Sequence, residues 1–211
     1  MERMAEPPVT ADHLQEVVPG VSHWRVANPN IGGATSSSHA VRSDSERTVL
    51  IDPVPLADEQ LEKLEPVAAI VLTAACHQRA AWRYRRRFGA SVYLPRGSRE
   101  TDEEPDVHYS EGDVLPGELE AVHVPGPEEP HFALLRHKEP AVLFCPDLVM
   151  VENEQLVFVP GEYHEDPNET RKSVERLLEL PFDVLCLDHG PPFLDDPKES
   201  LRQLLAVTRA W

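Results

Sequence analysis

Residues 67–89 read VAAIVLTAACHQRAAWRYRRRFG and combine an apolar run, a polar loop and a helical pattern. The run Val67–Thr73 is continuously apolar, which is typical of a strand covered on both faces. The segment Gln78–Phe88 is predicted to be a helix that ends at Gly89, a residue suited to the turn after a helix. Chemistry in α/β proteins usually lies where strands end. The stretch therefore predicts an α/β fold with a site in the loop that joins the strand to the helix.

Short strands are expected on both sides of this unit, separated by prolines and glycines. They are Leu14–Val18, Ser22–Ala27, Ser36–Arg42, Thr48–Ile51, Ser91–Leu94, Val107–Tyr109, Leu119–Val124, Phe132–Leu135, Ala141–Phe144, Leu156–Val159 and Asp183–Leu187. A further helix is expected at Ala57–Glu65, and Asp-Pro pairs at Asp166 and Asp196 begin two more. This order of elements predicts two mixed sheets packed face to face with helices outside.

The composition limits the partners. Asp and Glu number 37 against 20 Lys and Arg in 211 residues, a net charge of −17, which argues against nucleic acid and against an anionic membrane surface. The length predicts a single domain over 1–211, with 1–13 as a loosely ordered N-terminal segment. Three widely spaced cysteines and no apolar leader segment favour the cytoplasm.

Polar or sulfur residues follow several predicted strands, and their order carries a resemblance. They occur in Thr73–Arg79, in the Pro125-Gly126 turn, at Pro146-Asp147 and in His189-Gly190-Pro191. Together with Ile51-Asp52 at an earlier strand end, they resemble the metallo-β-lactamase superfamily of metallo-hydrolases. The resemblance runs from about Asn28 to the C-terminus. It implies a four-layer αββα sandwich that binds one or two metals, usually zinc, and hydrolyses esters, thioesters, amides or phosphodiesters.

The resemblance is uneven at the positions that hold metal in the family. Asp147 matches the family's bridging Asp, and His189 matches its last His. Other residues replace the remaining ligands: Ala74, Cys76 and Arg79 stand at His positions of the loop, Gln78 at its Asp, and Pro127 at the third His. The resemblance therefore implies the framework of the family together with a degenerate metal-binding motif.

These replacements predict that two-metal hydrolysis is absent and that no metal cofactor is bound. Gln78 cannot act as a base, and Arg79 places a permanent cation where a metal would lie. We expect the Arg79 guanidinium to pair with the Asp147 carboxylate and so to take the structural role of the metal.

An alternative reading keeps one metal. Cys76, Asp147 and His189, with His131 or water, offer ligand types that suit one Zn, Fe or Mn ion. The neighbouring polar residues have simpler interpretations. His77 is expected to point away from the cleft, Asp188 to be a cap or a surface acid, Glu128 and Glu129 to form a solvated turn, and the arginines of residues 83–87 to pair with acids.

Three functions follow from these readings. The first is a metal-free protein that binds a small molecule or a partner in its cleft. The second is a hydrolase of an ester, a thioester or a related substrate with a mononuclear metal site. The third is a structural or oligomerising protein with a vestigial cleft. The oligomeric state and the identity of the ligand are not determined by the sequence.

Overall fold

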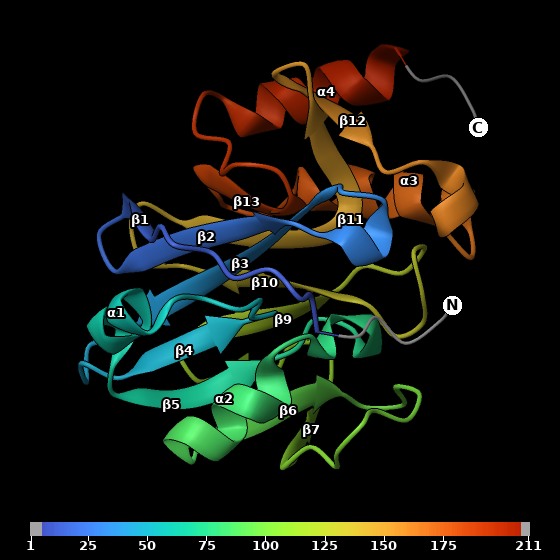
Figure 1. Cartoon of the computed structure of the whole chain (residues 1–211). Coiled ribbons are helices and arrows are strands. Elements are labelled where there is room, and N and C mark those ends of the chain that lie inside the picture. Colours follow the sequence, from blue (N-terminus) through green and yellow to red (C-terminus); the bar gives the residue numbers. More distant parts are fainter. Residues whose placement is uncertain (1–5, 208–211) are drawn as a thin grey trace.

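The computed structural model describes residues 6–207, which fold as two β-sheets packed face to face with helices on both outer faces (Figure 1). The predicted four-layer αββα sandwich is confirmed. Of the predicted N-terminal segment 1–13, residues 1–5 lie outside the described part. Ala11 is buried, and its backbone N–H donates to the carbonyl of Pro55.

The first sheet holds seven strands in sequence order. They are β1 (Gln15–Val18), β2 (Val21–Ala27), β3 (Thr35–Arg42), β4 (Thr48–Ile51), β5 (Val67–Val71), β6 (Ser91–Pro95) and β7 (Val107–Tyr109). Pairing is antiparallel from β1 to β4 and parallel from β4 to β7. The helices α1 (Asp58–Leu61) and α2 (Ala81–Phe88) cover its outer face (Figure 1).

The second sheet holds six strands, and its long central strand is bent. The strands are β8 (Val114–Leu115), β9 (Leu119–His123), β10 (Phe132–Arg136), β11 (Val142–Glu152), β12 (Gln155–Phe158) and β13 (Val184–His189). Their order is β12-β11-β10-β9-β8, and β13 runs parallel to β11. The helices α3 (Pro167–Leu177) and α4 (Pro197–Val207) lie on the outer face (Figure 1).

Three apolar layers hold the sandwich together. Neighbouring strand residues point to opposite faces, so Leu50 packs under the helices of the first sheet while Ile51 packs between the sheets. Leu143 and Val174 join the third layer, between the second sheet and its helices. Because both faces of the central strands are covered, only the ends of these strands reach the surface, at the edges of the sandwich. The site residues gather at one such edge.

The element boundaries differ from the predictions in two informative places. Gln78 lies in a short 3₁₀ turn, Ala75–Gln78, and α2 begins only at Ala81. The strand predicted at Ala141–Phe144 continues as β11 to Glu152, since the chain bends at Pro146 and Asp147 and then pairs again. Gly89 ends α2 in the left-handed conformation, as predicted. No helix in residues 6–207 is long and apolar enough to cross a membrane.

Candidate metal centre

The site lies where several strands of both sheets end. In the first sheet, Asp52 follows β4, and the loop after β5 carries Thr73, Cys76, His77 and Arg79. In the second sheet, His131 precedes β10 and Asp147 lies at the bend of β11. Strand β13 ends with Asp188 and His189. These residues come from distant parts of the chain, and the packing of the two sheets brings them together. The expectation of chemistry in the loop after Val67–Thr73 is consistent with this arrangement.

Asp147 is the centre of the cluster. Its Oδ2 lies 3.0 Å from Nε2 of His77, 3.9 Å from Nε2 of His131 and 4.0 Å from Sγ of Cys76. Its Oδ1 lies 2.9 Å from Nε2 of His189. Three imidazoles and a thiol therefore surround a single carboxylate.

Each of the three imidazoles is fixed through its other nitrogen. Nδ1 of His77 lies 2.9 Å from Thr73 Oγ1 and 3.2 Å from Asp52 Oδ2. Nδ1 of His131 lies 3.1 Å from the Val124 carbonyl. Nδ1 of His189 lies 2.6 Å from the Thr35 carbonyl. The Nε2 atoms of His77 and His131 are buried and make no well-aligned hydrogen bond, although the former is close to Asp147. Histidines that bind metals are commonly oriented in this way.

Arg79 is buried, but its partner differs from the predicted one. Its guanidinium donates two hydrogen bonds to the Asp188 carboxylate, at 2.9 and 2.5 Å, and further bonds to the carbonyls of Ser37 and Asp52. Burial lowers the pKa of Arg79, yet the adjoining Asp188 raises it above its ordinary value, so the cation is permanent. The prediction of an Arg79–Asp147 pair is wrong, because the Asp188 carboxylate lies beside the guanidinium and accepts hydrogen bonds from both of its terminal nitrogens.

Three other expectations about single residues are also wrong. His77 points into the cluster, because its Nδ1 is held by Asp52 and Thr73 and its ring therefore faces Asp147. Asp188 is a buried acid, since Arg79 neutralises it. Glu128 is buried as well, and its carboxylate accepts from the Cys76 backbone N–H at 3.4 Å.

The remaining predicted site residues bring no metal donor to Asp147. Ala74 is buried and apolar. The Pro127 carbonyl accepts a hydrogen bond from the backbone of Glu165. The Gln78 amide oxygen accepts from Trp82 Nε1 at 2.7 Å and from the backbone N–H of Asp102 at 2.8 Å. Gln78 therefore ties α2 to the following loop.

Neighbouring charges and burial shift the pKa values of the cluster. Burial opposes the charged form of His77, but the carboxylates of Asp147 and Asp188 hold its pKa well above its ordinary value. His77, followed by His131 and His189, correspondingly lowers the pKa of Asp147 against the effect of burial. Burial raises the pKa of the Cys76 thiol to about 12. Without a metal, the cluster is therefore an imidazolium–carboxylate network beside a neutral thiol.

Backbone strain is concentrated at the same place. Asp52, Arg79 and Asp147 have positive φ angles of 46°, 31° and 33°, a region that residues other than glycine seldom adopt. Such strain costs about 1–3 kcal/mol for each residue and persists where a site requires it.

The described residues contain three groups of donor atoms close enough to share an ion. They are Cys76–His77–Asp147, Asp52–His77–Asp188 and Asp147–Asp188–His189. Both groups that contain Asp188 meet the guanidinium of Arg79. Sulfur, imidazole nitrogen and carboxylate oxygen are the ligands zinc prefers, so the first group, with the open Nε2 of His131 beside Asp147, fits one such ion.

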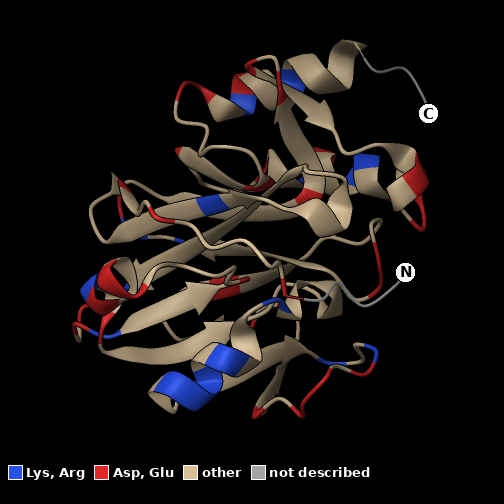
Figure 2. Ribbon diagram, viewed as in Figure 1, with Lys and Arg blue, Asp and Glu red and all other residues tan. Residues whose placement is uncertain are grey.

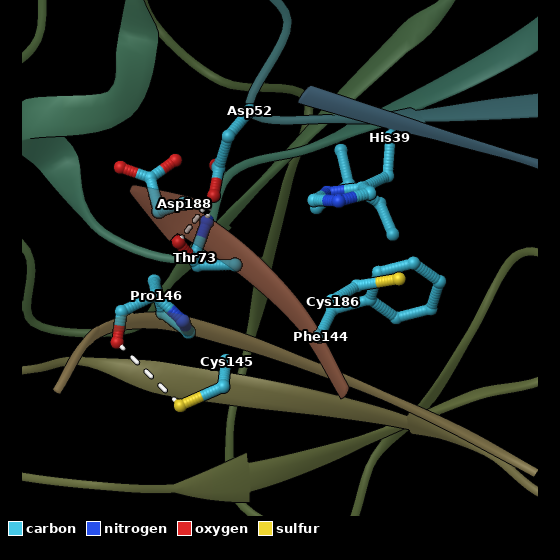
Figure 3. Close-up of a pocket in the computed structure, with 9 residues that line it drawn as sticks. His39, Asp52, Thr73, Phe144, Cys145, Pro146, Cys186 and Asp188 are labelled. Atoms are coloured by element: carbon cyan, nitrogen blue, oxygen red, sulfur yellow. Dashed lines mark hydrogen bonds between the residues drawn. The ribbon is translucent and has the colours of Figure 1, made fainter. Parts of the chain in front are cut away.

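A small cavity adjoins the cluster on its inner side. Its volume is about 10 Å³, enough for one water molecule, and His39, Asp52, Thr73 and Asp188 contribute to its wall (Figure 3). In Figure 3, Thr73 and Asp52 point toward each other, and the Thr73 hydroxyl donates to the Asp52 carboxylate at 2.5 Å. This bond helps to fix the carboxylate that orients His77.

The basic helix α2 is separate from the centre, and Figure 2 shows its cluster of cationic residues. Its arginines meet acids from other segments, as predicted: Arg83 with Glu6, Arg85 with Asp106, Arg86 with Glu103 and Arg87 with Asp58. This surface is therefore locally neutralised.

Comparisons with known proteins agree with the fold. The sequence profile of the metallo-beta-lactamase superfamily matches residues 17–207. The chain belongs to this superfamily. A search of curated protein sequences found no significant match.

Solved structures of metallo-beta-lactamases resemble the chain over most of its length. The BLEG-1 B3 metallo-beta-lactamase has a TM-score of 0.67 at 19% identity, over 86% of this chain and 99% of its own. The metallo-beta-lactamase from Pontibacter korlensis has a TM-score of 0.72 at 19% identity, over 92% and 99%. An archaeal superfamily protein from Sulfolobus tokodaii has a TM-score of 0.66 at 15% identity, over 83% and 80%. At these identities the likeness shows the fold alone.

Proposed function

We propose that the chain is a metal-dependent hydrolase that works with one ion, held by Cys76, His77 and Asp147 and completed by His131. The observation that carries the proposal is the convergence of three imidazole Nε2 atoms on Asp147, each ring fixed through its Nδ1. This donor set replaces the predicted alternative of Cys76, Asp147 and His189. The substrate class we propose is an ester, a thioester or a related acyl compound.

An ion held there supplies Lewis acidity, which polarises a carbonyl or phosphoryl oxygen and makes water more acidic. The chain's own residues do the rest. Asp52 and Thr73 keep the His77 ring turned toward Asp147. The His189 and Asp147 side chains are each 14% exposed, so a substrate approaches from their side. Burial opposes protonation of His189, but Asp188 and Asp147 raise its pKa, which favours the protonated ring when no metal is bound.

Metal analysis tests this proposal. Chain purified without chelator, or incubated with zinc, iron or manganese and then desalted, should hold about one ion and cleave acyl esters or thioesters. Cys76→Ala and His131→Ala should lose both properties because each removes a donor. His137→Ala, an exposed histidine paired with Glu120, is the matched control and should lose neither. A chain that takes up no metal and is not stabilised by any of the three ions would contradict the proposal.

A metal-free binding role is the second candidate, and the Arg79–Asp188 pair favours it because a guanidinium already neutralises a buried acid. In that case a chelator leaves the thermal stability unchanged, and a small acid or a thioester raises it.

We also propose the cytoplasm as the compartment of the chain, since Cys76, Cys145 and Cys186 are all free and buried.

A further inference from the structure

Arg79 makes more contacts than a simple packing role requires. Its side chain is fully buried and donates hydrogen bonds to both Asp188 oxygens and to two carbonyls. Its backbone is held at a φ of 31° and a ψ of −116°. A residue in a disfavoured conformation whose two terminal guanidinium nitrogens both donate to buried acceptors is held there by its surroundings.

The position of this cation bears on how many ions the centre can hold. Two of the three donor groups in residues 6–207 contain Asp188, and one of them also contains Asp147. The two Asp188 oxygens lie 2.9 and 2.5 Å from the guanidinium. An ion bound by Asp188 would have to displace a charge that does not titrate at neutral pH.

We infer that Arg79 is a built-in cation that limits the centre to one metal ion and keeps Asp188 from becoming a ligand. This inference rests on the proposed function, because it concerns the number of ions at the same site. Arg79 is thus a positioning residue. It fixes Asp188, and through the carbonyl of Asp52 it braces the strand end that orients His77.

The test is the metal content of Arg79→His, in which a neutral donor replaces the cation. The expected result is a rise from about one to about two zinc ions per chain. Arg79→Lys keeps the charge and should stay at about one. The double variant Arg79→His, Asp188→Asn removes the acid that would bind the second ion and should also return to about one.

The possible results separate this inference from the proposed function. One ion in both the natural chain and Arg79→His would overturn the inference and leave the proposal standing. No ion in the natural chain but one in Arg79→His would overturn the proposal and also the limit of one ion, because Arg79 would then exclude metal altogether. Two ions in the natural chain would overturn the inference.

Asp188 lacks its partner in Arg79→His when metal is absent, so a variant that is insoluble without metal needs a second measurement. Refolding with and without zinc settles that case. Folding that depends on zinc supports the inference, and failure to fold under both conditions, with Arg79→Lys folding normally, overturns it.

Discussion

At the residue scale, the centre depends on Asp52, the carboxylate that orients the His77 ring, as well as on Asp147 itself. Asp52 accepts hydrogen bonds from the Thr73 backbone and hydroxyl and lies 3.2 Å from Nδ1 of His77. This arrangement selects the ring orientation in which Nε2 faces Asp147. Loss of such an orienting carboxylate weakens metal binding in other proteins by about 10- to 100-fold.

We therefore predict that Asp52→Asn lowers zinc affinity by about 10- to 100-fold while the chain still folds. The amide keeps the shape of the carboxylate but loses its charge. Competition with a chromophoric chelator measures the affinity, and circular dichroism checks the fold. Asp44→Asn, which changes an exposed acid paired with Lys138, is the control. Equal affinities for the two variants would show that Asp52 does not support the centre.

The sequence predicted part of this site. Asp147 and His189 could be found because they stand at matching positions of a recognisable pattern. His77 could not, since its role depends on the direction of its ring, and His131 was named only as a possible additional ligand. Nδ1 of His77 is bonded to residues on two different loops, and His131 reaches the centre only through the Pro-rich turn at residues 125–130. The signal for His131 in the sequence was its place five residues after the Pro125-Gly126 turn.

At the scale of elements, the centre depends on how α3 packs against the turn before β10. Gly126 has a φ of 132°, and a Cβ placed there would lie 2.2 Å from Thr170 Oγ1, 2.4 Å from its N and 2.6 Å from its Cα. Backbone carbonyls of Gly126 and Pro127 also accept hydrogen bonds from Asp166 and Glu165. The turn that leads to His131 is thus fixed by the first turn of α3.

We predict that Gly126→Ala destabilises the chain by about 3 kcal/mol or more, because the start of α3 must move away. Urea unfolding measures the change. Gly97→Ala is the matched control, since its φ is 88° but nothing lies within 4 Å of the added Cβ. It should cost about 1–2 kcal/mol from backbone strain alone.

A double variant separates the causes of the Gly126 effect. Adding Thr170→Ala should not restore stability, because two of the three close atoms are backbone atoms. Full recovery in the double variant would mean that only the Thr170 hydroxyl opposes the substitution.

The elements themselves were predictable where local signals agree with packing. The helix start at Asp166 was predicted, and the Asp166 carboxylate accepts from the N–H groups of Asn168 and Glu169. The continuation of β11 beyond Pro146 was missed, since proline usually ends a strand and only the pairing with β12 and β13 restores it.

At the scale of the whole molecule, buried histidines between the sheets make the stability sensitive to acid. Burial, with a contribution from Arg25, lowers the pKa of His23 from 6.5 to about 4. The unfolded chain therefore binds this proton more readily than the folded chain. The stability contributed by neutral His23 is fully present above pH 6.5 and is lost as the pH falls toward 4.

Acidification from pH 7 to pH 4 lowers the free energy of unfolding of the natural chain. We predict that this loss is about 3 kcal/mol smaller in His23→Gln. Urea unfolding at the two pH values measures the difference. His108→Gln, at an exposed position of the edge strand β7, should behave like the natural chain. An identical pH dependence in His23→Gln and the natural chain would contradict the assignment.

We propose that Cys76 and the buried imidazoles form one metal centre with Asp147. X-ray absorption spectroscopy of the zinc-loaded chain tests it most directly, because it resolves the kinds of ligand atom around the ion. The predicted spectrum contains one sulfur at about 2.3 Å and at least two imidazole nitrogens at about 2.0–2.1 Å, and Cys76→Ala removes the sulfur. A zinc ion surrounded only by oxygen and nitrogen in the natural chain, or no bound zinc at all, would contradict the claim.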